Sequence, residues 1–216
     1  MSTTIVDQRE RACRALLRDK IHLDLESRTR LPILPSKSPL GRSAWAPALK
    51  LADRLQIFPS ELLDWWAVQP TGHVVIGSGV STYQPGPAQI GRRVLVNVVR
   101  IALLDLIHNE AAIFSALARL FDHLLGCNGE PAGLWLSEGG GCTPEWQAVG
   151  RRIQASYALG YAPSIVISPR DYFAWGIAIY CTDRRQLNLA DPVLERLLRA
   201  TVMNSSFWQK IAPQGT

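Results

Sequence analysis

The sequence has no long apolar run and no apolar segment near its beginning. Its longest apolar runs, VLVNVV and RIALLDLI, are too short or too charged to span a bilayer. The first residues, MSTTIVDQRERACR, are polar where a secretory signal peptide needs an apolar region. We therefore expect a cytoplasmic protein with no membrane partner.

Cysteine is scarce, and the motifs that rely on it are absent. Four cysteines, Cys13, Cys127, Cys142 and Cys181, are scattered along the chain without a CxxC pair. They neighbour apolar or small residues, a setting typical of buried reduced thiols rather than of disulfides or a zinc knuckle. We therefore do not expect the function to rest on cysteine chemistry.

Two further motifs are missing. The glycine-rich run SEGGG is too short for a phosphate-cradling GxxxxGK[ST] loop and has no lysine. The run GSGVS places Ser78 between glycines but lacks the GxSxG spacing of a nucleophile elbow. We therefore expect neither nucleotide binding nor a serine nucleophile.

Charge of both signs is present, with an excess of positive charge. The 216 residues are 47% hydrophobic, enough for a substantial core, and carry a formal charge of +5. A net positive field attracts polyanions, whereas dispersed arginines are also typical of solvated faces. The arginines that stand out are three pairs and one looser set: Arg92-Arg93, Arg151-Arg152, Arg184-Arg185, and Arg9, Arg11, Arg14 and Arg18.

The pattern divides the chain into three parts. Residues 5–26 place apolar residues at near-helical spacing with arginines opposite, which predicts an amphipathic helix. We interpret residues 1–30 as an N-terminal helical arm, either packed or free to move. Residues 31–47 are rich in proline and have little periodicity, which indicates a linker. Residues 48–216 then form one domain.

Periodicity predicts the elements of that domain in order. Short helices come first, followed by three β-rich stretches: HVVIGSGV, the turn-rich hairpin STYQPGPAQI, and RRVLVNVV. A helix over residues 103–125 should end at Gly126, and a glycine-rich loop separates it from three more helices. Ser168 and Asp191 are the expected N-caps of the last two. The fold class is therefore α+β, a small sheet flanked by helices.

The helix over residues 103–125 carries the positions of most interest. Its apolar residues form a core-facing stripe that includes Ile113, Leu117, Leu120 and Leu124. Its other side holds Ser115, Ala116, Arg119 and Asp122, with His123 adjacent.

The end of this helix, LFDHLLG, is similar to the run after HExxH in peptidases related to the anthrax lethal factor catalytic domain and to the Mlc titration factor peptidases. In HExxH enzymes two histidines four residues apart bind one zinc ion, and the intervening glutamate activates water. Downstream, SPRDYFAWGIAIYCTDRRQLNLADPVLERLL resembles the segment in which these families supply the third ligand. The resemblance covers about Pro59 to Leu198 and implies a zincin-like domain.

Position by position, the resemblance implies that the zinc site has been lost. The two histidines correspond to Ser115 and Arg119, the glutamate to Ala116, and the third ligand to Asp171. Asp122 matches an aspartate that follows HExxH in these families. Serine, alanine and arginine cannot hold zinc, and alanine cannot act as a base. We therefore expect no catalytic residue, metal or cofactor, and an Arg119–Asp171 ion pair at the former metal position.

The function that follows is non-catalytic. We expect a zincin-like pseudoenzyme that binds another protein or a macromolecular assembly, as an inhibitor, adaptor or assembly component in a bacterial cell or mobile element. Trp135 in the glycine-rich loop and Trp175 beside the vacated site are the favoured partner contacts, because aromatic side chains anchor many interfaces.

Two alternatives stay open. The first is a metallopeptidase with a displaced zinc site built from His108, Glu110, His123 and Asp171. The second is a basic nucleic-acid-binding accessory protein that uses Arg9, Arg11 and Arg14.

Overall fold

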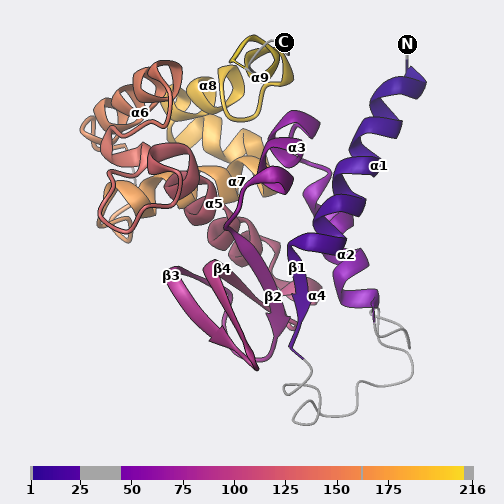
Figure 1. Ribbon diagram of the computed structural model, residues 1–216. Coiled ribbons are helices and arrows are strands. Elements are labelled where there is room, and N and C mark those ends of the chain that lie inside the picture. Colours follow the sequence, from indigo (N-terminus) through magenta and orange to yellow (C-terminus); the bar gives the residue numbers. More distant parts are fainter. Residues whose placement is uncertain (1, 25–44, 162, 212–216) are drawn as a thin grey trace.

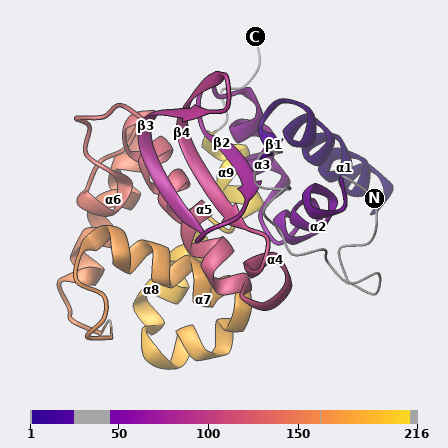
Figure 2. The same cartoon turned by 90° about the horizontal axis from the view of Figure 1, so that it is seen from below.

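A four-stranded sheet forms one side of the molecule, and helices cover one of its faces. The computed structural model describes residues 2–24, 45–161 and 163–211, with side chains from Glu10 onward. Figure 1 shows the helices stacked above the sheet, and Figure 2, seen from below, shows the strands in front of the helices. The architecture is α+β, which confirms the predicted fold class.

The sheet has the strand order β1-β2-β4-β3. Its strands are β1 (Ile21–Leu23), β2 (His73–Gly77), β3 (Thr82–Ile90) and β4 (Arg93–Ala102). β1, β2 and β4 run parallel, whereas β3 pairs with β4 in antiparallel orientation. Residues of β2 and β4 on the helix-covered face belong to the main core: Val74, Ile76, Val99 and Ile101.

β3 is one irregular strand rather than the hairpin predicted for STYQPGPAQI. Its register with β4 shifts between Gln84 and Pro87. At this point the backbone amide of Gly86 donates a hydrogen bond of 2.8 Å to the Oδ1 atom of buried Asn97. The Asn97 side chain thus satisfies an amide that the interrupted ladder leaves unpaired. The turn of the hairpin comes later, at Gly91, between β3 and β4.

Nine α-helices lie within the described residues. They are α1 (Ser2–Asp19), α2 (Ala46–Leu55), α3 (Ser60–Val68), α4 (Asp105–His108), α5 (Glu110–Cys127), α6 (Pro144–Tyr157), α7 (Pro169–Ala190), α8 (Pro192–Ala200) and α9 (Ser205–Ile211). A short 3-10 helix, η2 (Leu136–Glu138), lies between α5 and α6. None of the described helices combines the length and the apolar character needed to cross a bilayer.

Side-chain caps set several helix boundaries. Ser168 and Asp191 each accept a hydrogen bond from the backbone amide three residues on, which confirms both predicted N-caps. Asn109 caps α5 in the same way, so the helix predicted over residues 103–125 is two helices, α4 and α5. The last predicted helix also divides, into α8 and α9, because the backbone leaves the helical region at Thr201.

α5 passes through the centre of the core. The predicted apolar stripe is fully buried, including Ile113, Leu117, Leu120 and Leu124. Gly126 does not end the helix as expected, because α5 continues to Cys127 and is capped by Asn128 with a φ of 54°. A Cβ atom on Gly126 would lie 2.2 Å from the backbone nitrogen of Leu136. This glycine therefore allows η2 to pack against α5, rather than serving as a helix stop.

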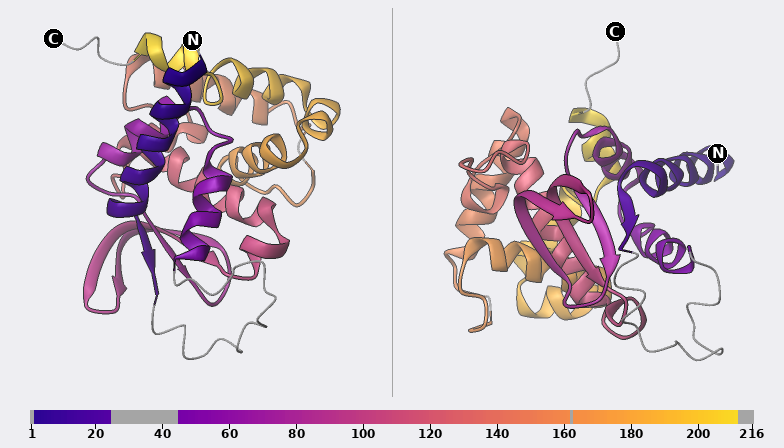
Figure 3. Two further views of the ribbon diagram at one scale, coloured as in Figure 1. Left: turned by 90° about the vertical axis from the view of Figure 1, so that its right-hand side faces the viewer. Right: turned by 60° about the horizontal axis from the view of Figure 1, so that its bottom comes forward.

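The N-terminal segment belongs to the core and to the sheet. α1 buries Ala12, Cys13 and Leu16 in the main core and packs against α3 and α2, as Figure 3 also shows. The helix predicted over residues 5–26 ends at Asp19, and the chain continues as edge strand β1. Ile21 pairs with β2, and this tertiary contact outweighs the helical periodicity.

The predicted linker over residues 31–47 falls mainly on residues outside the described part of the chain. Its last two residues belong to α2, which begins at Ala46 with Pro47 in its first turn. Proline is well tolerated there because the first amides of a helix have no helical acceptor.

The junction between α1 and the sheet is a cluster of basic side chains. The Lys20 ammonium group is buried and donates hydrogen bonds to the backbone carbonyls of Gln69 and Thr71. The Nε2 atom of His22 lies 3.2 Å from the Nδ1 atom of His73, across β1 and β2. Such a contact needs one ring nitrogen without a proton. Burial, aided by Lys20, lowers the pKa of His73 to about 4, and burial also lowers the pKa of His22.

We expect acid to destabilise this junction. A histidine whose pKa is lower in the folded state binds protons more readily when unfolded, so its contribution is complete above about pH 6.5 and is lost as the pH falls toward about 4. Between about pH 7.5 and about pH 4.5, the wild-type protein should lose about 1–2 kcal/mol more stability than His73→Gln. Urea unfolding at both pH values measures this difference, and equal losses in the two proteins would contradict the expectation.

Candidate functional site

The candidate site lies where α5 and α7 pack side by side. Ser115 and Arg119 stand one turn apart on α5, and Asp171 lies in the first turn of α7. The Nη2 atom of Arg119 donates to the Oδ1 atom of Asp171 at 2.5 Å. The predicted ion pair is therefore present. Its two side chains are 33% and 24% exposed, so solvent screens it only in part.

Asp171 is held from a second side by the residue that caps its helix. The hydroxyl of Ser168 donates to the Oδ2 atom of Asp171 at 2.6 Å and accepts from the Asp171 amide at 3.1 Å. Burial alone would raise the pKa of Asp171, but the hydrogen bonds from Ser168 and Arg119 bring it below its ordinary value. The carboxylate is therefore charged at neutral pH, with both oxygens occupied by protein donors.

Ser115 and Ala116 are the other two positions that the sequence resemblance assigns to the HExxH motif. Ser115 is half-buried, and Ala116 is 3% exposed, within the main core. A methyl group at the position of the glutamate cannot accept a proton from water. The arrangement therefore offers a salt bridge between two helices, in which Asp171 is the carboxylate.

Asp122 lies deeper, on the buried side of α5. Its carboxylate accepts from the Ser137 amide at 2.7 Å and from the Ser137 hydroxyl at 2.6 Å. Burial raises the pKa of Asp122 to about 7, against the lowering effect of these two bonds. Asp122 therefore fixes η2 onto α5 and does not join Arg119 and Asp171.

His123 is fully buried between β3 and the loop after α5. Its Nε2 atom lies 2.9 Å from the backbone carbonyl of Glu130, and its Nδ1 atom lies 2.6 Å from the hydroxyl of Tyr83. Because a carbonyl can only accept, Nε2 carries the proton and Tyr83 donates to Nδ1. Burial lowers the pKa of His123 and raises that of Tyr83, so both groups are neutral near pH 7.

Trp135 lies between His123 and Arg170. Its ring stacks on the imidazole with centroids 4.7 Å apart, and the Cζ atom of Arg170 lies 4.0 Å above the ring. Glu138 accepts two hydrogen bonds from Arg170, at 2.8 and 3.0 Å, and one from the Trp135 amide at 3.1 Å. Trp135 is only 5% exposed. The interpretation of Trp135 as a partner contact is therefore not supported, because its faces are covered by this chain.

Trp175 is half-buried and stacks on Tyr172 with ring centroids 6.2 Å apart. It thus keeps part of its surface open, on the same helix as Asp171.

Sequence reasoning missed the cluster formed by Tyr83, His123, Trp135, Glu138 and Arg170. These residues come from β3, α5, the loop around η2 and α7. The one local signal was His123, a polar residue within an apolar helical run, which implies a buried hydrogen-bond partner.

The displaced zinc site predicted as an alternative is not assembled. Glu110 pairs with Arg54 at 2.5 Å, His123 is bonded to Tyr83, and Asp171 is bonded to Arg119. Within the described residues, no group of three or more His, Cys, Asp or Glu side chains is arranged to hold a metal ion. The fourth residue of the predicted set, His108, is the last residue of α4.

Arg11, Arg14 and Arg18 are exposed and lie on one face of α1, at helical spacing. Arg14 pairs with Glu10 at 2.6 Å and Arg18 with Asp19 at 2.8 Å, both along α1. Arg11 is exposed, whereas the side chain of Arg9 lies outside the described part. All four cysteines lie in the described part, and none forms a disulfide.

No family model, curated protein or solved structure matches the chain. The resemblance to the metallopeptidases therefore stays a prediction from the sequence.

A double-mutant cycle should measure the Arg119–Asp171 pair. We expect a coupling energy of about 0.5–1.5 kcal/mol between Arg119→Ala and Asp171→Asn, because the pair is partly shielded from water. Denaturant unfolding of the wild type, both single variants and the double variant gives this value. The more exposed pair Glu10–Arg14, with side chains 58% and 72% exposed, is the matched control, with an expected coupling below about 0.5 kcal/mol. Additive effects of Arg119→Ala and Asp171→Asn on the free energy of unfolding would show that the ion pair contributes no stability.

Proposed function

We propose that this chain is a zincin-like pseudoenzyme that acts by binding another protein or a macromolecular assembly, as an inhibitor, adaptor or assembly component. In this proposal the chain keeps the layout of a metallopeptidase domain but lacks the groups that such an enzyme needs for zinc and for proton transfer. We further propose that it works in the cytoplasm, where unpaired cysteines such as its own remain reduced.

The contact that carries this proposal is the ion pair between Arg119 and Asp171. The metallopeptidase resemblance requires the side chains at Ser115, Arg119 and Asp171 to converge from two helices. Arg119 and Asp171 do converge, at 2.5 Å, although 52 residues separate them in the chain. A guanidinium and a carboxylate can join two helices electrostatically where zinc would join them by coordination.

A loop beside this pair supports a binding role. The described residues 158–161 and 163–167 lie between α6 and α7, and the second stretch leads directly into Ser168, which holds Asp171. Ile165 and Ile167 in this loop are 80% and 81% exposed. Leu159 and Tyr161 are also more than half exposed. Large apolar side chains gathered on one exposed segment are typical of protein interaction sites.

Restoring the ligands tests whether the arrangement is that of a zinc site. The variant Ser115→His/Arg119→His/Asp171→Glu should bind one zinc ion per chain at least about 100-fold more tightly than Ser115→His/Arg119→His/Asp171→Ala. The second variant is the control, because two histidines four residues apart bind zinc weakly on any helix. Equilibrium dialysis with metal analysis measures both affinities.

Two results would count against the proposal. Equal zinc affinity in the two variants would mean that α5 and α7 do not have zincin-like geometry. Stoichiometric zinc in the purified wild-type protein would mean that the chain has kept a metal site.

The loop before α7 provides the test of partner binding. We expect Ile165→Asp/Ile167→Asp to reduce the amount of the main co-purified protein at least about fivefold, because a charge in a desolvated contact is costly and a few residues carry most of the binding energy of an interface. Affinity purification from the native host with quantitative mass spectrometry measures this. Val68→Asp/Val80→Asp is the matched control, since both valines are 78% exposed and lie on other segments. Equal recovery with both variants would exclude the loop as the interaction surface.

A further inference from the structure

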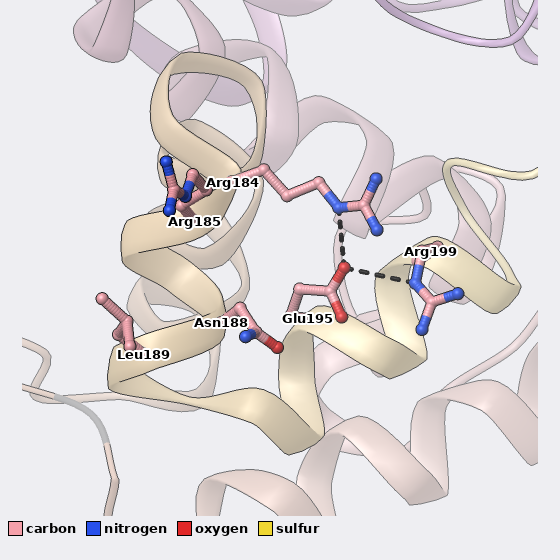
Figure 4. Close-up of a pocket in the computed structure, with 6 residues that line it drawn as sticks. All are labelled: Arg184, Arg185, Asn188, Leu189, Glu195 and Arg199. Atoms are coloured by element: carbon pink, nitrogen blue, oxygen red, sulfur yellow. Dashed lines mark hydrogen bonds and ion pairs between the residues drawn. The ribbon is translucent and has the colours of Figure 1, made fainter.

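A pocket lies at the end of α7 that is far from Asp171. There the backbone of Asp183 leaves the helical region, with φ −149° and ψ 81°, and its carboxylate caps the continuing helix at the Gln186 amide. α8 then returns beside this last part of α7. A pocket of about 520 Å³ opens between the two helices, and Figure 4 shows its lining residues: Arg184, Arg185, Asn188, Leu189, Glu195 and Arg199.

Glu195 organises the pocket. Its side chain is only 5% exposed. Its Oε1 atom accepts a hydrogen bond of 2.7 Å from the Nε atom of Arg184 and forms an ion pair with the Nε atom of Arg199 at 3.3 Å. Figure 4 shows the terminal nitrogens of both guanidinium groups directed away from the carboxylate. Both arginine side chains are about half exposed, 51% and 52%. Their terminal N–H groups can therefore meet a ligand from solvent.

The pocket carries an excess of positive charge. Three arginines and one glutamate line it, which leaves two positive charges without a counterion among the lining residues. Arg185 has no ion-pair partner within the described part of the chain. An excess of positive charge along a pocket favours a negatively charged ligand.

Arg184 is also held in position before any ligand binds. Its Cζ atom lies 5.4 Å from the centroid of the Tyr180 ring, in addition to its bond with Glu195. A side chain already fixed by its neighbours loses little conformational entropy on binding.

We propose that this pocket binds the phosphate group of a small phosphorylated organic molecule. The paired N–H groups of arginine match the oxygen spacing of a phosphate, and two excess positive charges complement a dianion. The volume exceeds that of a phosphate alone, and Leu189, 85% exposed at the rim, offers apolar contact to an attached organic group. This inference is independent of the zincin-like assignment. It departs from the expectation that nucleotides do not bind, which rested on the lack of a glycine-rich phosphate loop.

Isothermal titration calorimetry of the full chain with pyrophosphate and with adenosine diphosphate tests the proposal. We expect dissociation constants below about 1 mM, and at least about tenfold weaker binding to Arg185→Ala/Arg199→Ala. Arg184→Lys/Arg199→Lys should weaken binding as well, because it keeps the charge but removes the planar donor pairs. The matched control is Arg151→Ala/Arg152→Ala, which removes an exposed arginine pair on α6 and should bind as the wild type does.

The outcomes separate clearly. Absence of binding, or equal weakening by the α6 control, would overturn the proposal. A single-stranded oligonucleotide that binds more tightly than adenosine diphosphate, with steep salt dependence and loss in Arg185→Ala/Arg199→Ala, would assign the pocket to nucleic acid instead and would also overturn it. Thermal unfolding of each variant shows whether it has folded. None of these results alters the expected outcome of the zinc experiment.

Discussion

The burial of α5 is the constraint on which the rest of the structure depends. The helix crosses the core with apolar contacts on most of its surface, and its polar residues Asp122 and His123 have no exposed area. A buried carboxylate or imidazole is costly unless other protein groups replace the water it has lost. The surrounding segments supply those groups: Ser137 to Asp122, and Tyr83 with the Glu130 carbonyl to His123. The glycine-rich loop is therefore held in place by hydrogen bonds to the buried polar side chains of α5.

That loop connects the parts of the molecule to one another. Trp135 stacks between a side chain of α5 and a side chain of α7, and Glu138 holds Arg170 at the start of α7. The close approach at Gly126 lets the backbone of η2 reach α5 at all. Because each contact involves a different element, the loop acts as structural support beside the candidate site rather than as a mobile cover over it.

The two charged clusters on α7 differ in what they leave open. At the start of the helix, Arg119 and the Ser168 hydroxyl together occupy both oxygens of Asp171, so charge is balanced. At its end, a single buried carboxylate, Glu195, holds two arginines and leaves their terminal donors and a net positive charge facing solvent. A balanced pair stabilises packing between helices, whereas an unbalanced cluster is suited to binding an anion. Packing and ligand binding are thus assigned to opposite ends of the same helix.

The sequence by itself determined the elements whose signals are local. Periodicity identified the buried stripe of α5, and cap chemistry located the starts of α7 at Ser168 and of α8 at Asp191. The pairing of Arg119 with Asp171 also followed from residue types and the resemblance. Only the tertiary structure decided that the chain after Asp19 is a strand, that Gly126 is a packing contact, and that Trp135 is buried. Each of these outcomes depends on contact between segments that lie far apart in the chain. A local sequence pattern does not determine which distant segment will pack against it.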